Sequence, residues 1–386
     1  MESGIHIRQY HILRSLAGYS DVDLLVYSRE PAEISREIQS LCRNVYVFHR
    51  NPAADNVRKN SLQRLIQVYR ELRGWPLDER RPDKNKLNAD MLDVLKKDYD
   101  LIWIARLSNA LRISQSGNKN VVLDLDDIEH LKITREIESL NKSLWKKVRL
   151  WISARAWRIS EMDAINRYSG VVVCSSKDKK YLGNTGNIFV IPNGATVDAN
   201  SVFNPGIPGR MLYIGTMNYY PNEDAVCYFV KNILPRVQSQ IPEAHLVVVG
   251  KNPSKAIRDI ADGKTVQIIG RVDDVSPYLK EAALSVVPLR IAGGTRLKIL
   301  ESLACKTPVV STTIGAEGLE IEDGKHIIIA DENRQFSDAC VRLMGSVEMR
   351  RQLSENGYDL VKNFYSWDII SDKVKYILDS IISNNV

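Results

Sequence analysis

The sequence has few of the features that mark membrane-spanning, secreted or metal-stabilised proteins. Its longest apolar runs, such as residues 246–249, are far too short to cross a bilayer. The first residues contain no apolar signal-peptide core, which predicts a cytoplasmic protein. The five cysteines are Cys42, Cys174, Cys227, Cys305 and Cys340. Because none of them has metal-site or redox-pair spacing, we expect a reducing compartment and no metal site.

Other common signatures are also missing. No internal repeat or low-complexity tract is present, and no Gly-x-Gly-x-x-Gly motif follows an expected strand, which argues against a Rossmann dehydrogenase. Zinc-finger spacing and RNA-binding aromatic motifs are absent too. The 386 residues are 44% apolar and 26% charged, with a net charge of +6. This composition indicates a folded globular protein that suits acidic partners such as nucleotide phosphates, anionic lipids or nucleic acid.

Short apolar runs alternate with helical patterns along the whole chain. The expected strands cover residues 22–27, 45–48, 101–105, 121–125, 171–174, 188–191, 211–214, 245–249, 266–269, 284–288, 309–311 and 327–330. Many of these runs are continuously apolar, as in strands buried on both faces of a parallel sheet. Helices are expected between them, for example over residues 222–239 and 296–304. The order predicts an α/β protein with doubly wound parallel sheets.

One change in composition marks a domain boundary. Residues 193–209 are rich in Gly, Pro and Asn and have no periodicity, so we expect a linker there. An N-terminal domain over residues 1–192 and a second domain over residues 210–365 would then face each other across a cleft. Ligands of open α/β sheets bind at the carboxyl ends of the strands.

The most informative segment is residues 288–310, which has the order strand, glycine-rich turn, helix and strand. Gly293 and Gly294 allow a close approach of backbone to a ligand, and Thr295 is a candidate cap for a helix that starts near Arg296. Free N–H groups at such a helix start attract anions. Two nearby cations and one carboxylate follow on the helix: Arg296, Lys298 and Glu301. The combination favours a nucleotide diphosphate over an ordinary surface turn.

This segment resembles the nucleotide-sugar site of retaining glycosyltransferases of family 4, which have the GT-B fold. Further similar segments follow in the family's order over residues 190–386: 191–194, 213–222 with its helix, 270–279, 310–319 and 364–367. The N-terminal half matches more weakly, through residues 4–8 and 124–127. The resemblance implies two Rossmann-like domains and a helix over residues 366–386 that crosses back to the first domain. It also implies a UDP- or GDP-linked sugar as donor, a glycan or lipid-linked glycan as acceptor, and no cofactor.

The resemblance assigns roles to individual residues. Arg296 and Lys298 are expected to stabilise the leaving diphosphate, with Asp127 as a third catalytic candidate. The expected donor-binding residues are Gly215, Arg271, Val272, Gly293, Gly294, Thr295 and Glu301. The acceptor-side candidates are Gly4, Asp126 and His130. From the residues alone, Asp126 and Asp127 equally suit a helix cap, and His130 equally suits an ordinary helical position.

The sequence departs from the family pattern in two places. Many members carry two glutamates eight residues apart, but Gly293 stands where the first is expected relative to Glu301. The usual Arg and Lys pair after the first strand of the donor domain is missing from residues 217–222. We therefore expect Arg296 and Lys298 to take its place.

Two basic, aromatic stretches have two interpretations. Residues 145–158 and residues 58–81 combine Arg and Lys with Trp. Each suits either a helix in a membrane interface or a buried helix with a charged rim. The first interpretation predicts a peripheral protein at the inner face of the cytoplasmic membrane.

Two alternative functions remain at this stage. A GT-B nucleotide-sugar epimerase would require more acidic and histidine residues in its cleft. A basic nucleic-acid-binding protein without catalysis is suggested by the net charge alone. The start of the chain adds one expectation: residues 5–16 have the pattern of the helix that follows the family's first strand, so that strand is expected to be missing. Two outcomes are then expected as alternatives: either the natural protein begins earlier, or the N-terminal domain is loose and acceptor activity is poor while the C-terminal domain still binds nucleotide.

Overall fold

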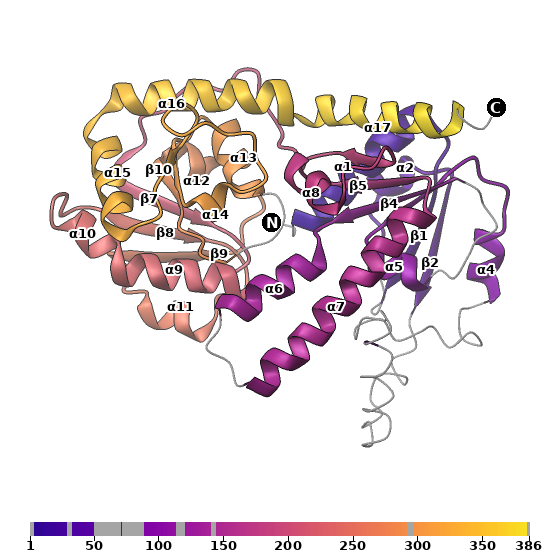
Figure 1. Cartoon of the computed structure of the whole chain (residues 1–386). Coiled ribbons are helices and arrows are strands. Elements are labelled where there is room, and N and C mark those ends of the chain that lie inside the picture. The colour runs from indigo at the N-terminus through magenta and orange to yellow at the C-terminus, as the bar shows by residue number, and fades with distance from the viewer. Residues whose placement is uncertain are drawn as a thin grey trace. The chain divides into compact units, whose positions relative to one another are not determined.

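The computed structural model describes residues 4–28, 33–49, 71, 89–112, 120–139, 144–291 and 296–383. The chain divides into two compact units (Figure 1). The N-terminal unit comprises residues 7–191 and 371–386, and the C-terminal unit comprises residues 192–370 and the first six residues. The division along the chain falls between Ile191 and Pro192.

The described strands of the N-terminal unit form two parallel sheets. One sheet pairs β1 (Asp23–Ser28) with β2 (Asn44–His49). The other has the order β3 (Ile102–Ala105), β4 (Val121–Asp126), β5 (Gly170–Val173) and β6 (Ile188–Val190). The central strands β4 and β5 are buried along almost their whole length. Their continuously apolar sequence follows from this burial on both faces.

The helices of the N-terminal unit alternate with these strands. They are α1 (Gly4–Tyr19), α2 (Arg36–Ser40), α4 (Ala89–Leu95), α5 (Leu107–Arg112), α6 (Glu129–Ser139), α7 (Leu144–Arg167) and α8 (Ser176–Leu182). The predicted helix over residues 5–16 lies within α1, which is the first described element. Residues 1–3 lie outside the described part of the chain.

The C-terminal unit is built on one six-stranded parallel sheet. Its order is β12 (Ile328–Ile329), β11 (Val309–Ser311), β10 (Ala282–Val287), β7 (Ile207–Ile214), β8 (His245–Val249) and β9 (Val266–Gly270). From β7 the chain proceeds outward through β8 and β9, then returns to the other side of β7 as β10. The order therefore reverses between β7 and β10, and this is where open α/β sheets bind ligands.

Both faces of this sheet are covered. On β7, Met211 and Tyr213 belong to one apolar cluster, whereas Leu212 and Ile214 belong to another on the opposite face. The covering helices are α9 (Tyr220–Asn232), α10 (Leu234–Gln238), α11 (Lys255–Ile260), α12 (Ser276–Glu281), α13 (Leu297–Ala304), α14 (Thr313–Ala316), α15 (Asn333–Gly345) and α16 (Val347–Leu360). A π-helical turn, η2 (Val361–Tyr365), leads into α17 (Trp367–Ser383), whose first four residues belong to this unit.

The parallel sheets of the two units confirm the predicted fold class, and all twelve expected strands are present with ends no more than four residues from the predicted ones. Two details differ. The single helix predicted over residues 222–239 is broken into α9 and α10 at Ile233, because Pro235 has no N–H group to continue the helix. Strand β7 starts at Ile207, so the last three residues of the predicted linker belong to this strand.

None of the helices described in the structure is both long enough and apolar enough to cross a membrane.

Gly250 allows the ends of β7 and β8 to meet. A Cβ atom at this position would lie 1.7 Å from the Gly215 carbonyl oxygen, and the Gly250 φ is +158°. Gly263 also has a positive φ, of +74°, but a Cβ there would meet no atom within 4 Å. A side chain at Gly263 would therefore add only backbone strain, whereas a side chain at Gly250 would also collide with the neighbouring backbone.

We expect Gly250→Ala to lower the free energy of unfolding by about 3 kcal/mol or more, because the backbone itself must move. Gly263→Ala, the control, should cost only about 1–2 kcal/mol of left-handed strain. Urea denaturation measures both values. Equal losses in the two variants would contradict the close approach at Gly250.

Candidate functional site

A lysine of α13 contacts side chains of β7 and α9. The Lys298 Nζ donates hydrogen bonds to the Tyr213 hydroxyl and to the Asn222 Oδ1, each at 2.8 Å. The Tyr213 hydroxyl in turn donates to the same Asn222 oxygen at 2.8 Å. The ammonium also lies 4.1 Å from the centre of the Tyr213 ring, within cation–π range. These three side chains join β7, α9 and α13 beside the point where the strand order reverses.

Gly215 leaves room for this arrangement. A Cβ atom there would lie 2.8 Å from the Asn222 Nδ2. That nitrogen donates to the Thr216 carbonyl at 2.9 Å, which fixes the orientation of the amide. Asn222 therefore presents its oxygen to Lys298 and its nitrogen to the loop backbone.

The surroundings of Lys298 weaken its hold on a proton. Burial, together with the positive charge of Arg296, lowers the pKa of Lys298 to about 7. The amine has no carboxylate as a hydrogen-bonding partner in the described chain, only the neutral Tyr213 and Asn222. An anion that arrives beside it would favour the charged form and so bind more tightly.

Arg296 is the N-cap residue of α13 and is only 6% exposed. Its Nη2 and Nε donate to the Ile314 carbonyl at 3.2 and 3.4 Å. The helix begins at Leu297, so the prediction that Thr295 caps it is wrong: the cap position falls on Arg296. Gly293, Gly294 and Thr295 lie outside the described residues.

Glu301 lies one helical turn beyond Lys298 on α13. Burial raises the pKa of its carboxyl group to about 7, and the charge of Asp274 adds to this effect, whereas Lys298 opposes it. Within the described part of the chain, the Glu301 side chain has no hydrogen bond or ion pair. A half-buried carboxylate without partners is costly and suits a ligand that donates hydroxyl groups.

The loop after β9 carries the predicted base-binding residues. Gly270 ends the strand with a φ of +85°, and Arg271 follows on the surface. The Val272 side chain is half-buried against the apolar cluster of Leu212 and Val249.

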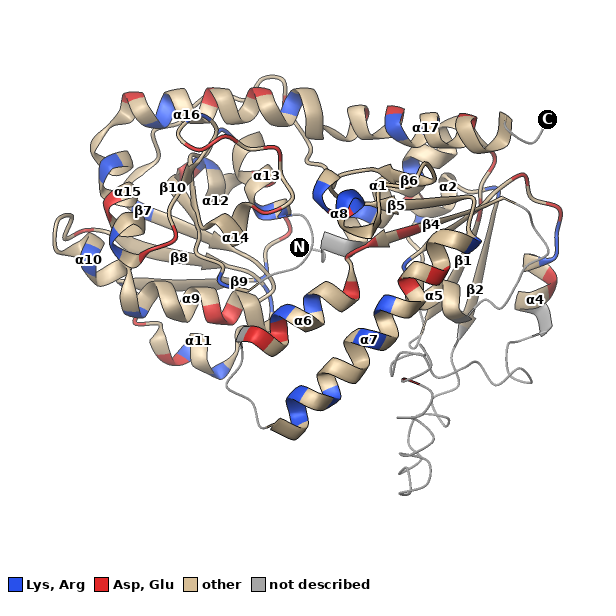
Figure 2. Cartoon of the chain, in the orientation of Figure 1, with Lys and Arg blue, Asp and Glu red and all other residues tan. Residues whose placement is uncertain are grey.

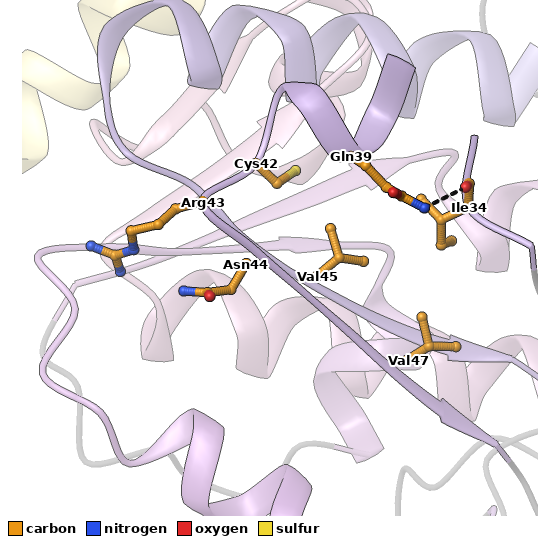
Figure 3. A pocket seen from close by; sticks show the side chains of 7 residues that line it. All are labelled: Ile34, Gln39, Cys42, Arg43, Asn44, Val45 and Val47. Carbon is orange, nitrogen blue, oxygen red and sulfur yellow. Dashed lines mark hydrogen bonds between the residues drawn. The ribbon is translucent and has the colours of Figure 1, made fainter. Parts of the chain in front are cut away.

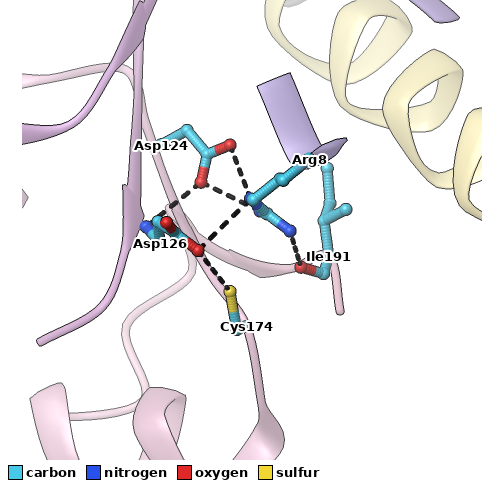
Figure 4. A network of polar contacts seen from close by, with 5 residues as sticks. All are labelled: Arg8, Asp124, Asp126, Cys174 and Ile191. Carbon is cyan, nitrogen blue, oxygen red and sulfur yellow. Dashed lines mark hydrogen bonds and ion pairs between the residues drawn. The ribbon is translucent and has the colours of Figure 1, made fainter. Parts of the chain in front are cut away.

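The N-terminal unit has its own polar cluster at the carboxyl end of β4 (Figure 4). The Arg8 side chain, 1% exposed, donates from Nε and Nη2 to the two Asp124 oxygens at 3.0 and 2.9 Å. Its Nη1 donates to the Ile191 carbonyl at 3.0 Å. The guanidinium also lies 3.9 Å from Asp126, whose other neighbour is the Cys174 Sγ at 3.6 Å.

Asp126 is strained as well as buried. Its φ is +62°, in the left-handed region that non-glycine residues seldom adopt. Burial raises the pKa of its carboxyl group to about 7, and the charge of Asp127 raises it further. Backbone strain of this kind is concentrated at functional sites. Asp127 itself is more accessible, with its carboxylate 3.9 Å from the Lys132 Nζ.

His130 is engaged on both ring nitrogens. Its Nδ1 contacts Glu161, and its Nε2 lies 2.9 Å from the Tyr181 hydroxyl. The His130 side chain is buried, and burial also raises the pKa of Glu161. These contacts join α6, α7 and α8, so the structure gives His130 a position inside a helix-packing network. Gly4, the remaining acceptor-side candidate, is the first residue of α1.

A hollow of about 450 Å³ lies elsewhere, beside α2 and β2 (Figure 3). Its lining residues are Ile34, Gln39, Cys42, Arg43, Asn44, Val45 and Val47. Gln39 is occupied by a hydrogen bond to the Ile34 carbonyl at 2.8 Å. Among the described residues, none of the predicted site residues lines this hollow.

Sequence reasoning missed Tyr213, Asn222, Arg8 and Glu161 as members of these clusters. Tyr213 and Asn222 did lie within residues 213–222, the segment that resembles the start of the family's donor domain. The signal was therefore present, but their partner Lys298 is more than seventy residues away in the chain.

The raised pKa of Glu301 has a consequence for stability. A carboxyl group whose pKa is higher in the folded state stabilises the fold below its ordinary value of 4.5, and this contribution is lost as the pH rises to about 7. Glu301→Gln, which stays neutral, should match the parent near pH 4.5. Above pH 7 it should be more stable by about 1–3 kcal/mol. Urea denaturation at pH 5 and pH 8 measures this, and a variant that is less stable at pH 8 would contradict the assignment.

Comparison with known proteins gives the context of this site. Residues 208–346 match the family model described as "Glycosyl transferases group 1". An uncharacterized 44.6 kDa protein in the cps region of Klebsiella pneumoniae is 22% identical over 363 residues, which cover 89% of this chain and 88% of that protein.

Solved structures are similar over nearly the whole chain. A sucrose-phosphate synthase from Thermosynechococcus elongatus has a TM-score of 0.69 at 17% identity, with 98% of this chain and 93% of that chain covered. A mutant of TarM from S. aureus, in complex with Fondaparinux, alpha-GlcNAc-glycerol and UDP, has a TM-score of 0.67 at 12% identity, with 98% and 97% covered. The chain thus has the GT-B fold, and the match to the glycosyl transferases group 1 model lies within its C-terminal unit.

Proposed function

We propose that this protein transfers a sugar from a nucleotide-diphosphate sugar to a glycan or lipid-linked glycan acceptor in polysaccharide or cell-envelope glycan biosynthesis. The observation that carries the proposal is the position of the Lys298 amine, held by Tyr213 and Asn222 where the strand order reverses. The group 1 domain and the relative in a cps region support the same function. The TarM mutant complex with UDP supports a uridine nucleotide over GDP as the first donor to test.

The donor diphosphate would lie beside the start of α13. Arg296 and Lys298 there supply positive charge to a leaving group that becomes more negative in the transition state. Residues 217–222, which follow β7 and enter α9, contain no cation, and the Lys298 Nζ lies 2.8 Å from the Asn222 side chain in the first turn of α9. Lys298 therefore brings the missing charge from another helix. Gly215 forms the floor below the diphosphate.

The nucleoside would extend along α13 toward the loop after β9. Glu301, with no partner among the described residues, would accept hydrogen bonds from two ribose hydroxyl groups. Backbone groups around Arg271 and Val272 would bind the base. Gly293, Gly294 and Thr295 complete the proposed donor site from the segment outside the described residues.

On the acceptor side, the proposal favours Asp126 and Asp127 at the carboxyl end of β4. Arg8 and Asp124 hold this strand end in place, and Asp126 is kept in a strained conformation. Either carboxylate would orient an acceptor hydroxyl group by hydrogen bonding. We further propose a family 4 mechanism with retention of anomeric configuration, at the cytoplasmic side of the membrane.

Glu301→Ala and Arg296→Ala should each weaken UDP binding by about ten- to a hundredfold. Each change removes hydrogen bonds in which one group is charged, the Glu301 carboxylate in one case and the Arg296 guanidinium with the diphosphate in the other, worth about 1.5–3 kcal/mol. Lys306→Ala is the control, since Lys306 follows the same helix but pairs with Glu355. Isothermal titration with UDP measures the affinities, and parent-like binding by both site variants would refute the donor site.

Donor use is expected to be independent of divalent metal ions. Arg296 and Lys298 provide the charge that a metal would supply, and no Asp-x-Asp motif lies beside the donor segment. Sugar transfer or donor hydrolysis should therefore continue at the same rate in excess chelator. Activity that disappears with chelator and returns with Mg²⁺ or Mn²⁺ would contradict this.

A further inference from the structure

The outward face of α7 is unusually apolar. Leu144 is 81% exposed, Trp145 86%, Val148 50% and Trp151 59%. Ile159 and Met162 continue the same exposed face toward the C-terminal end. The buried residues of this helix, among them Ala156, Trp157, Ser160 and Ala164, lie on the opposite side. The exposed apolar residues therefore are not the core-facing side of an amphipathic helix.

The charges on the same part of α7 are all positive. Lys146, Arg155 and Arg158 are exposed, and Lys147 is half-exposed. Between residues 144 and 160 there is no Asp or Glu, and Figure 2 shows blue bands along this helix without red ones until its C-terminal part. Arg149, on the same helix, differs from these cations because its guanidinium is paired with the Glu71 carboxylate.

An ordinary solvent-facing helix of this protein looks different. The exposed residues of α16 include Glu348, Arg351, Gln352 and Asp359, in which both signs of charge are mixed with amide groups. Such a face is well hydrated and needs no partner. The α7 face instead exposes two large aromatic rings, and the nearby Arg155 and Arg158 form no ion pair with any residue that the structure describes.

We propose that the α7 face, defined as Leu144, Trp145, Val148, Trp151, Arg155, Arg158, Ile159 and Met162, binds the surface of a bilayer that contains anionic lipids. Tryptophan side chains favour the boundary between headgroups and acyl chains, where the indole ring is in apolar surroundings and its N–H remains solvated. Lysine and arginine attract anionic headgroups across the same boundary.

The helix would lie in the plane of the interface. Its 24 residues make it about 36 Å long, but its buried polar residues and its many cations exclude insertion across the bilayer. This surface goes beyond the proposed sugar transfer: it describes where the protein works, independently of which donor it uses.

The test is vesicle co-sedimentation of the full-length protein without donor or acceptor, so that failure here leaves the proposed transfer untouched. The vesicles contain phosphatidylcholine alone or with about one third phosphatidylglycerol. We expect binding to the anionic vesicles only, weakened at least tenfold in 0.5 M salt. Tryptophan emission should shift to shorter wavelength on binding.

Trp145→Ala combined with Trp151→Ala should reduce binding at least tenfold and remove the emission shift. The matched control combines Phe364→Ala and Tyr376→Ala, which removes two aromatic side chains that are also exposed, 58% and 66%. Arg155→Gln combined with Arg158→Gln should reduce the preference for anionic vesicles. This second variant tests the same face if the tryptophan variant does not fold.

Three results would overturn the proposal. The first is parent protein that binds neutral and anionic vesicles equally or binds neither. The second is folded α7 variants that bind like the parent. The third is binding to single-stranded RNA that exceeds binding to anionic vesicles, which would assign this face to nucleic acid instead.

Discussion

The donor-side account depends on one hydrogen-bonded contact, that of the Lys298 amine with Tyr213 and Asn222. It joins the central strand of the C-terminal sheet, the helix after it and helix α13. The reversal of strand order between β7 and β10 predicts a ligand site there, and this contact determines that the charge beside it is positive. Because the amine is bonded to neutral groups and lies near Arg296, it is poorly satisfied without an anion. The same burial raises the pKa of Glu301 on the next turn. Both groups are thus less stable in the empty protein than they would be beside a bound nucleotide.

The N-terminal unit also contains a buried cation, but there an acidic side chain pairs with it. There the buried cation, Arg8, is fully engaged with Asp124 and the Ile191 carbonyl, so its charge is balanced within the protein. The strain is instead carried by Asp126, with its left-handed backbone and raised pKa. One unit therefore places a buried lysine among neutral hydrogen-bonding groups, and the other places two neighbouring carboxylates, Asp126 and the more accessible Asp127, at the end of a strand. This is the distribution expected if one binds a diphosphate and the other orients hydroxyl groups.

Much of the fold could be predicted because its parallel strands are buried on both faces. Continuous apolar runs such as that of β8 report this burial directly, and α13 was recognised from its glycine-rich entrance. The contacts between distant segments could not be predicted in this way. Lys298 and Asn222 are far apart in the chain, and either residue alone suits an ordinary surface position. His130 was a candidate for acceptor binding, but its partners Glu161 and Tyr181 come from two later helices and engage both ring nitrogens. The helix break at Ile233 was readable in principle, since Pro235 prevents continuous hydrogen bonding.

The most direct measurement is a crystal structure of the protein with UDP bound. The account predicts the diphosphate within hydrogen-bonding distance, about 3 Å, of the Lys298 Nζ, and the ribose hydroxyl groups at the Glu301 carboxylate. Lys298 should still contact Asn222 or Tyr213. A nucleotide bound away from α13, or a diphosphate held only by residues elsewhere, would contradict the account.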